Sequence, residues 1–298
     1  MSSLRNVLFI INRFAGTAYS SKLEDIIIQA SKKSNVEPVL EFTKGPGHAT
    51  ELAKSFASEN FHTVVAVGGD GTVNEVARGL IGTGVPLGII PRGSGNGLAR
   101  HLFLPLTVLE AVNNVYSGIR IEMDTFTLNQ KLSLNVSGIG FDGHIANLFG
   151  GKTKRGLTGY ATLTLREFMK FREFESKVTS GKDTWHFKSF VLAIANSSQY
   201  GNNAWIAPSA SVTDGLLNLN VLRKIPPYRF DFVYAFFNKT IDRSPYCNIK
   251  TLAGFSVETS VPIPYHVDGE PCGAASNFEI EVNPATLPVI VPDKSLSR

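Results

Sequence analysis

A glycine-rich turn carrying a single carboxylate is the first feature of the sequence that could do chemistry. It follows the apolar run 64–67, precedes a segment with helical periodicity, and consists of Gly68, Gly69, Asp70, Gly71 and Thr72. In open α/β sheets, nucleotides bind at the carboxyl ends of strands. Glycines let the backbone approach a phosphate, and free N–H groups at the start of the next helix attract anions. Because Asp70 would repel phosphate without an intervening cation, the turn predicts a phosphate site with Mg²⁺ bound directly or through water.

A second glycine-rich turn follows the next apolar run, at 87–90. It precedes another helix-like stripe and contains Pro91, Arg92, Gly93, Ser94, Gly95 and Asn96. One such turn alone is as compatible with a plain tight turn as with ligand binding. Two neighbouring turns with hydroxyl and amide side chains can grip one polyphosphate from two sides, which favours the phosphate site.

Several common nucleotide and metal motifs are absent from the sequence. It contains no GxxxxGK[ST] motif, no HRD or DFG element of protein kinases, and no GxGxxG dinucleotide fingerprint. Cys247 and Cys272 stand alone, which argues against a structural zinc site or a disulfide framework and fits a reducing cytoplasm. The histidines form no HExxH-like cluster, so histidine ligation of a metal is not expected.

The elements that must hold the two turns alternate between short apolar runs and helix-period segments. The apolar runs lie at 7–11, 36–43, 64–67 and 87–90. Apolar side chains at i, i+3, i+4 and i+7 mark the intervening helices, for example Val73, Val76, Ala77 and Leu80. This alternation predicts parallel strands joined by crossover helices, and hence an α/β domain over residues 1–125.

From about residue 122 the pattern changes to closely spaced runs with period-two alternation. Such runs occur at 126–128, 132–136, 190–194 and 217–221. They predict an antiparallel, strand-rich second domain over residues 126–283. Two helical interruptions are expected within it, at 158–174 and 229–237.

Bulk composition limits the partners. The 298-residue chain has 29 Lys and Arg against 25 Asp and Glu, and because these are scattered no nucleic-acid partner is expected. No stretch approaches the ~20 apolar residues of a membrane span, which predicts a cytoplasmic protein, at most peripheral at the inner membrane surface. Basic residues at 152–155, with Arg166, Lys170 and Arg172, can face anionic lipid or form an ordinary solvated surface.

Several motifs together resemble diacylglycerol kinase catalytic domains, sphingosine kinases and bacterial YegS-like or DgkB-like lipid kinases. In the first domain the matching segments are 43–53, 68–76 and 86–96. In the second domain they are 135–142, 207–217 and 267–270. The sequence GGDGT alone also occurs in NAD kinases, but its continuation through Asn74 and Glu75 favours lipid kinases.

The resemblance implies a fold and an activity. The implied fold is a Rossmann-like, three-layer α/β domain of the NAD kinase and diacylglycerol kinase type, followed by an antiparallel β-sandwich, with residues 284–298 returning to the first domain. The implied activity is ATP- and Mg²⁺-dependent phosphorylation of a hydroxyl of diacylglycerol or a related lipid, such as a sphingoid base or ceramide. An NAD kinase-like enzyme and a catalytically silent nucleotide- or lipid-binding regulator are the alternatives. Oligomeric state is left open, with a homodimer as one alternative.

The resemblance also implies roles for individual residues. Glu270 matches a general base on the lipid hydroxyl, Asp70 would serve the phosphates and metal, and Asp124 matches an acidic position linked to Asp70. Asp214, with the carbonyls of Ser211 and Leu216, matches a structural Mg²⁺ site. The plainer interpretations are a solvated turn carboxylate for Glu270 and an ordinary Asp-Gly turn at Asp214. The implied nucleotide-binding residues are Asn12, Thr43, Gly68, Gly69, Asp70, Gly71, Thr72, Val73, Asn74, Gly93, Ser94, Gly95 and Asn96.

Two positions depart from the family pattern. Arg13 follows Asn12 where the family usually has proline, so the geometry of this first loop is less constrained by resemblance. Many bacterial members carry aspartate at the position of Gly97. The glycine at this position resembles sphingosine-kinase-like and ceramide-kinase-like versions instead. The second departure slightly favours a long-chain base as acceptor.

Overall fold

The chain folds as two compact units. The computed structural model describes residues 5–16, 22–59, 61–149, 157–226 and 228–293. Unit 1 comprises Met1–Thr125, Tyr200–Asn203 and Pro284–Arg298, and unit 2 comprises Phe126–Gln199 and Ala204–Asn283. The chain passes from one unit to the other within two long strands, β5 (Ile119–Leu128) and β16 (Glu270–Val291), and also on either side of Tyr200–Asn203.

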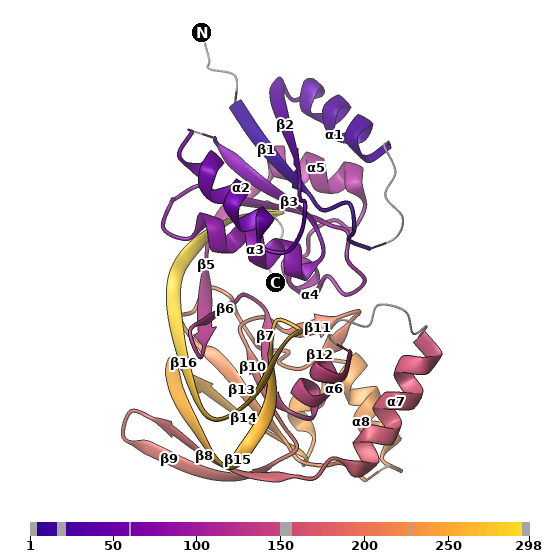
Figure 1. Ribbon diagram of the computed structural model, residues 1–298, viewed down its shortest axis with the longest axis vertical. Helices are drawn as coiled ribbons and strands as arrows, with labels where there is room; N and C mark the ends of the chain where they lie inside the picture. Colours follow the sequence, from indigo (N-terminus) through magenta and orange to yellow (C-terminus); the bar gives the residue numbers. More distant parts are fainter. Residues whose placement is uncertain (1–4, 17–21, 60, 150–156, 227, 294–298) are drawn as a thin grey trace. The chain divides into compact units, whose positions relative to one another are not determined.

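Unit 1 is built on a parallel β-sheet with the strand order β16, β4, β3, β1, β2 (Figure 1). Continuous apolar runs form these strands because both faces of a parallel sheet are buried. The end of β16 adds to the edge at β4, where Val289 pairs with Leu87. The other strands are β1 (Arg5–Ile11), β2 (Val36–Phe42), β3 (Thr63–Gly68) and β4 (Leu87–Pro91).

Helices cover both faces of this sheet, as the alternating pattern predicts (Figure 1). On one face, Ile27 and Val112 from two helices pack with Phe9 and Val65 of the strands. The predicted stripe from Val73 to Leu80 is buried on another helix. The helices are α1 (Lys22–Lys33), α2 (His48–Ala57), α3 (Asp70–Leu80), α4 (Gly97–His101) and α5 (Val108–Ser117).

Unit 2 is antiparallel. Its strands follow the order β14, β13, β10, β7, β15, and β15 also pairs with β8 and β16. This arrangement, together with unit 1, confirms the predicted α/β fold followed by an antiparallel sandwich. The strands are β6 (Lys131–Ser133), β7 (Val136–Gly140), β8 (Phe174–Ser180), β9 (Asp183–Ser189), β10 (Val191–Ala195), β13 (Leu217–Leu222), β14 (Cys247–Leu252) and β15 (Gly254–Val267). A separate short pair consists of β12 (Ala204–Trp205) and β11 (Gln199–Gly201), whose last two residues belong to unit 1.

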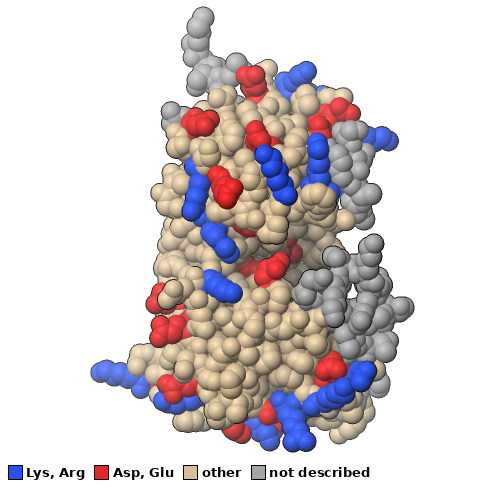
Figure 2. Space-filling view, in the orientation of Figure 1, with Lys and Arg blue, Asp and Glu red and all other residues tan. Residues whose placement is uncertain are grey.

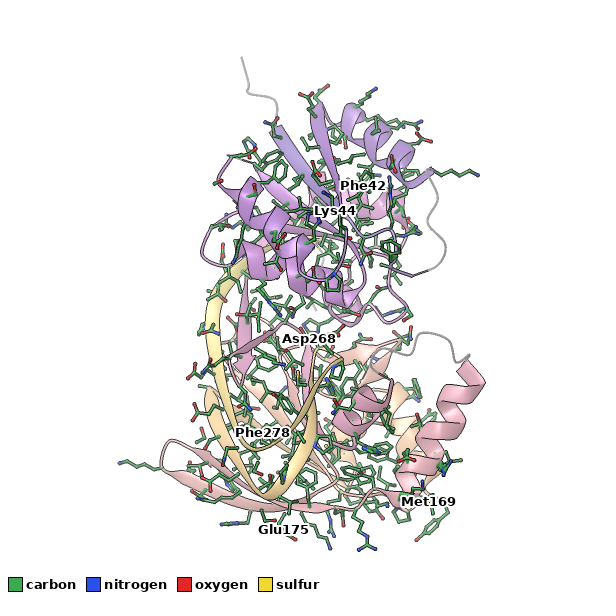
Figure 3. All side chains as sticks on the ribbon, in the orientation of Figure 1. Phe42, Lys44, Met169, Glu175, Asp268 and Phe278 are labelled. Carbon is green, nitrogen blue, oxygen red and sulfur yellow. The ribbon has the colours of Figure 1, made fainter. Side chains whose placement is uncertain are left out.

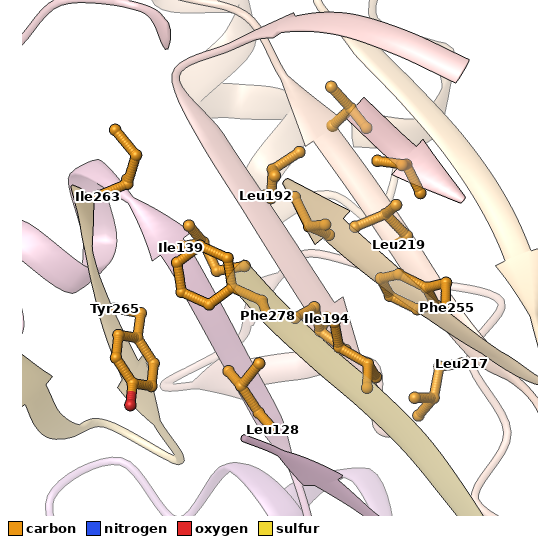
Figure 4. Close-up of a cluster of buried hydrophobic side chains, with 14 of the residues drawn as sticks. Leu128, Ile139, Leu192, Ile194, Leu217, Leu219, Phe255, Ile263, Tyr265 and Phe278 are labelled. Atoms are coloured by element: carbon orange, nitrogen blue, oxygen red, sulfur yellow. The ribbon is translucent and has the colours of Figure 1, made fainter. Parts of the chain in front are cut away.

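Alternate side chains of these strands form one hydrophobic core (Figure 4). Ile139, Leu192, Ile194, Leu219 and Phe278 are buried in it. Each such side chain contributes roughly 1.5–3 kcal/mol to folding. The core therefore supplies a rigid support for the turns at the ends of its strands.

The helices of unit 2 lie beside its strands (Figure 1). Phe141, the first residue of a helix, stacks on Phe190 with ring centroids 4.8 Å apart. The helix expected at 158–174 ends earlier, because residues from Phe174 onward pair as β8. Within the described ranges, no helix combines the length and apolar character needed to cross a bilayer. The helices are α6 (Phe141–Phe149), α7 (Leu157–Lys170), α8 (Phe230–Phe237) and the 3₁₀ helix η1 (Ile241–Arg243).

Charged side chains are dispersed over the face shown in Figure 2, where Lys and Arg are interspersed with Asp and Glu. The formal net charge of the whole chain is only +4. Charge on this face does not by itself mark a binding site.

Candidate active site

The loops that follow β1 and β3 leave the sheet of unit 1 at its topological switch point. From β1 the chain continues to β2 on one side, whereas β3 pairs on the other side. The backbone N–H of Asn12 donates to the carbonyl of Val67 at 3.0 Å, and that of Thr43 to the carbonyl of Ile11 at 3.0 Å. These bonds place Asn12, Thr43 and the Gly68 turn at the carboxyl edge, where open α/β sheets bind nucleotides.

Asn12 joins the loop after β1 to the glycine turn after β3. Its Nδ2 donates to Thr72 Oγ1 at 2.9 Å, and its Oδ1 accepts the N–H of Phe14 at 2.9 Å. A Cβ at Gly68 would lie 2.5 Å from Thr72 Oγ1, so only glycine leaves room for this hydroxyl. The first turn of α3 is therefore fixed against a loop that is distant in sequence.

Glycines allow three loops to meet backbone to backbone. A Cβ at Gly93 would lie 2.7 Å from the Cα of Gly69, and a Cβ at Gly16 would lie 1.8 Å from the carbonyl oxygen of Arg92. The N–H of Arg92 donates to the carbonyl of Gly68 at 2.7 Å. The two predicted glycine turns thus lie against each other, as gripping one polyphosphate requires.

The second turn is held by its own asparagine. Asn96 Oδ1 accepts the N–H of Gly93 at 2.8 Å, and its Nδ2 donates to the carbonyl of Gly93 at 2.8 Å. Asn96 has a φ of 50°, a conformation that asparagine tolerates better than most residues. Ser94 at the tip of the turn is exposed. Gly95 lies near the carboxylate of Asp70, since a Cβ there would be 3.5 Å from Asp70 Oδ2.

Residues 200–203 support this second turn, and sequence reasoning missed them. The N–H of Asn202 donates to the carbonyl of Gly95 at 3.3 Å, and Gly201 forms a β-bridge with Asn96. A Cβ at Gly201 would lie 2.9 Å from backbone atoms of Gly95. The only signal in the sequence is a turn-forming Gly-Asn-Asn run, which does not identify its partner.

A pocket of about 330 Å³ opens beside the glycine turn. Its volume falls in the usual range for small-molecule sites. Glu75 takes part in its wall, with Oε2 accepting the N–H of Ala49 at 3.3 Å. Phe42 and Lys44, which flank Thr43, are labelled in Figure 3. The lining residues are Asn12, Phe14, Thr43, Gly45, Pro46, Ala49, Thr72 and Glu75.

Asp124 is buried on the strand that leaves unit 1. Its Oδ1 accepts the N–H of Ala285 at 2.8 Å, and the neighbouring Thr125 Oγ1 lies 2.8 Å from Thr286 Oγ1. These contacts tie β5 to the returning segment of β16. The structure thus gives Asp124 a bond to backbone, and its link to Asp70 stays a prediction.

The loop with the implied metal residues has oxygen donors of the type that Mg²⁺ prefers. Asp214 Oδ1 accepts the N–H of Leu216 at 3.0 Å, and Ser211 Oγ accepts the N–H of Thr213 at 3.3 Å. In the part of the chain that the structure describes, no group of three or more His, Cys, Asp or Glu could hold a metal ion. Carbonyl oxygens or water would therefore have to complete the coordination of a cation at Asp214.

Glu270 begins β16, directly after a two-residue hairpin turn. Asp268 and Gly269 have φ values of 48° and 88°, the positive values of a type I′ turn. Asp268 lies at this turn (Figure 3), and its carboxylate accepts the Ser133 hydroxyl at 2.6 Å and the N–H groups of Leu134 and Asn135 at 2.8 and 3.0 Å. Glu270 itself is exposed. The anchored turn therefore presents the carboxylate of Glu270 at the surface of unit 2. The basic stretch at 152–155, for which contact with anionic lipid is one interpretation, lies outside the described residues.

Two family models match the chain. The model of the diacylglycerol kinase catalytic domain matches residues 6–128. The model of the YegS C-terminal NAD kinase beta sandwich-like domain matches residues 135–291, more than half of the chain. The glycine turns and Asn12 lie within the first match, and Asp214 and Glu270 lie within the second.

Individual proteins show the same similarity. "Probable lipid kinase YegS" of Escherichia fergusonii is 28% identical over 301 residues, covering 98% of each chain. "Probable lipid kinase YegS-like" of Chromohalobacter salexigens is 28% identical over 256 residues, covering 84% of this chain and 82% of the relative. A Bacillus anthracis protein described as a diacylglycerol kinase has a solved structure with a TM-score of 0.77, 20% identity, and coverage of 99% of this chain and 100% of that one. The structural likeness shows the fold.

Proposed function

Since the chain belongs to the kinase family that combines a diacylglycerol kinase catalytic domain with a YegS-type C-terminal sandwich domain, we propose that it phosphorylates a lipid hydroxyl with ATP. Diacylglycerol is the first candidate acceptor, with a sphingoid base or ceramide as related ones. The single observation that carries the proposal is the contact of two glycine turns, through Gly69 and Gly93, beside a pocket large enough for a small molecule.

The nucleotide would bind to unit 1. The pocket at Thr43 and Thr72 suits the nucleoside, and the glycine turns offer backbone N–H groups to the phosphates. The start of α3 adds the positive end of a helix dipole. In phosphoryl transfer, catalysis comes mainly from holding the triphosphate in line with its acceptor and from stabilising the charge on the phosphates.

The carboxylates divide between the phosphates and the acceptor. Asp70, in the first turn of α3, would hold Mg²⁺ against the phosphates, directly or through water, and Asp214 would hold a structural Mg²⁺ in unit 2. A bound Mg²⁺ neutralises phosphate charge. Glu270 would accept the proton of the lipid hydroxyl. As it does so, the hydroxyl oxygen of the lipid would bond to the γ-phosphorus of ATP, and the bond between that phosphorus and the leaving ADP oxygen would break.

Exposed apolar side chains on α7 support contact between unit 2 and a lipid surface. Leu165 is 63% exposed and Met169, labelled in Figure 3, is 58% exposed. Lys170 and Arg172 are exposed next to them. Apolar side chains beside cations suit the interface of an anionic bilayer. The acceptor should therefore be offered in vesicles that contain anionic lipid.

The proposal is tested by incubating the protein with radiolabelled ATP, Mg²⁺ and vesicles carrying diacylglycerol, a sphingoid base or ceramide. We expect label in a lipid product. NADP formation from NAD would instead support an NAD kinase, and tight ATP binding without transfer to any lipid would support a silent regulator.

The base assignment is tested by Glu270→Gln, which keeps the shape of the side chain and removes its basicity. We expect kcat to fall by about 100-fold or more, since a general base typically contributes at least that factor. Glu279→Gln, an exposed glutamate on the same strand, is the matched control. Full activity of Glu270→Gln would refute the assignment.

A further inference from the structure

His266 is a buried histidine of unit 2 whose two ring nitrogens both have partners. Its side chain is only 5% exposed. Nδ1 accepts the backbone N–H of Gly269 at 3.0 Å, and Nε2 lies 3.3 Å from Asp142 Oδ2. A nitrogen that accepts an N–H carries no proton, so the geometry requires the neutral tautomer with the proton on Nε2, donated to Asp142.

Small residues allow Asp142 to reach this histidine. A Cβ at Gly138 would lie 1.8 Å from Asp142 Oδ2, so the carboxylate lies directly over the strand at that glycine. A Cβ at Gly143 would lie 2.5 Å from the Cα of Tyr265, so α6 packs directly on the backbone of β15. Asp142 Oδ1 also accepts the N–H of Gly143 at 2.8 Å, which orients the carboxylate. The pair is thus built into the contact between α6 and β15.

The bond from His266 completes the support of the turn that carries Glu270. Asp268 is held through its carboxylate by residues 133–135, and Gly269 is held through its N–H by His266. Both turn residues have positive φ values, which cost energy at Asp268 in particular. We propose that His266, oriented by Asp142, is a positioning residue that fixes the peptide between Asp268 and Gly269, in the turn directly before Glu270. The inference rests on the proposed function, because it takes Glu270 to be the base.

Two substitutions separate the two bonds of His266. In His266→Asn, the amide oxygen takes the place of Nδ1 and can still accept the N–H of Gly269. In His266→Gln, the amide reaches the place of Nε2 and can pair with Asp142, but nothing accepts the N–H of Gly269. Both variants lose one bond and part of the ring, so we expect a similar loss of thermal stability in the two.

Lipid kinase activity should distinguish these variants. We expect kcat of His266→Gln to fall by about 10- to 100-fold, as displacement of a catalytic group by about 1 Å does, and kcat of His266→Asn to stay within about threefold of the native value. KM for ATP should be unchanged in both, because the nucleotide loops belong to unit 1. Equal loss of kcat in the two variants, following their stability, would overturn the inference.

Spectra of the native protein test the same inference without activity. In ¹⁵N-histidine-labelled protein, we expect an unprotonated Nδ1 and a protonated Nε2 at His266 at neutral pH; a protonated Nδ1 would overturn the inference. The amide hydrogen of Gly269 should exchange slowly in the native protein and His266→Asn, and faster in His266→Gln. If the native protein phosphorylates no lipid, the proposed function fails, and the exchange rates of the Gly269 amide alone decide the role of His266. Equal exchange rates in the native protein, His266→Asn and His266→Gln would contradict that role.

Discussion

At the scale of single residues, Asn12 controls two loops with one amide group. Its oxygen accepts the N–H of Phe14, and its nitrogen donates to Thr72, 60 residues further along the chain. An amide can do both because it carries a donor and an acceptor on one plane. Aspartate lacks the donor and alanine lacks both, so neither can replace it.

We expect Asn12→Ala to weaken ATP binding. Loss of a partly buried hydrogen bond costs about 1 kcal/mol, which corresponds to roughly a fivefold higher Kd. Isothermal titration with ATP measures the change. Asn113→Ala, at an exposed position of α5, is the control. Unchanged ATP affinity in Asn12→Ala would show that this bond does not organise the site.

His101, at the end of α4, links stability to pH. Burial lowers its pKa from 6.5 to about 4. Between these values the unfolded chain binds a proton that the folded chain does not, so the free energy of unfolding falls as the pH drops from 6.5 to 4. Glutamine does not titrate in this range, so the free energy of unfolding of His101→Gln should fall by about 1–3 kcal/mol less on acidification than that of the native protein.

Urea unfolding of native protein and His101→Gln at pH 7 and pH 4.5 measures that difference. His62→Gln is the control, because His62 is exposed. The same loss of stability in native protein and His101→Gln on acidification would contradict the assignment.

At the scale of elements, glycines set how closely helices and strands approach. Gly79 lies where α3 crosses α2, and a Cβ there would lie 2.6 Å from the Cβ of Ala53 and 2.7 Å from the carbonyl oxygen of Thr50. The hydroxyl of Thr50 in turn donates to the carbonyl of Glu75 at 2.7 Å. Since α3 begins at Asp70, the spacing of these two helices also affects the position of the glycine turn.

Overpacking a contact with backbone costs about 1–3 kcal/mol, and alanine gains roughly 1 kcal/mol over glycine in a helix. We therefore expect Gly79→Ala to lower the free energy of unfolding by a net amount of up to about 2 kcal/mol. Urea denaturation measures the balance. Gly254→Ala is the matched control, because its Cβ would meet no atom closer than 3.4 Å. A more stable Gly79→Ala would show that the helices can separate without cost.

At the scale of the whole molecule, unit 1 is assembled from separate parts of the chain. Leu287, Val289 and Val291 of β16 are fully buried. At roughly 1.5–3 kcal/mol each, their burial rivals the total stability of a typical domain. The Ala285 N–H also satisfies the buried carboxylate of Asp124. Unit 1 therefore cannot fold without the end of β16.

We expect residues 1–125 alone to lack a cooperative thermal transition. Joining them to residues 284–298 through a linker of about five residues should restore it, because Thr125 and Thr286 lie side by side with their hydroxyl oxygens 2.8 Å apart. Circular dichroism melting of the two fragments measures the difference. Equal melting of the two would contradict the role given to β16.

Local pattern in the sequence determined the kinds of element and the chemistry of the two turns. The stripe from Val73 to Leu80 predicted a buried helical face, and the glycines predicted close backbone approach, because periodicity and missing side chains act over a few residues. Resemblance to known motifs added the family and the candidate role of Glu270, and the family assignment is confirmed.

Only the tertiary structure decided which distant groups meet. Nothing local pairs Asn12 with Thr72, Asn202 with the turn at Gly95, or Asp268 with residues 133–135. Hydrogen bonds of this kind depend on how strands and helices are placed in space, and a residue's type fixes what it can bond to without fixing its partner. The chemistry of the site was therefore predictable from its residues, whereas its geometry was set by the fold.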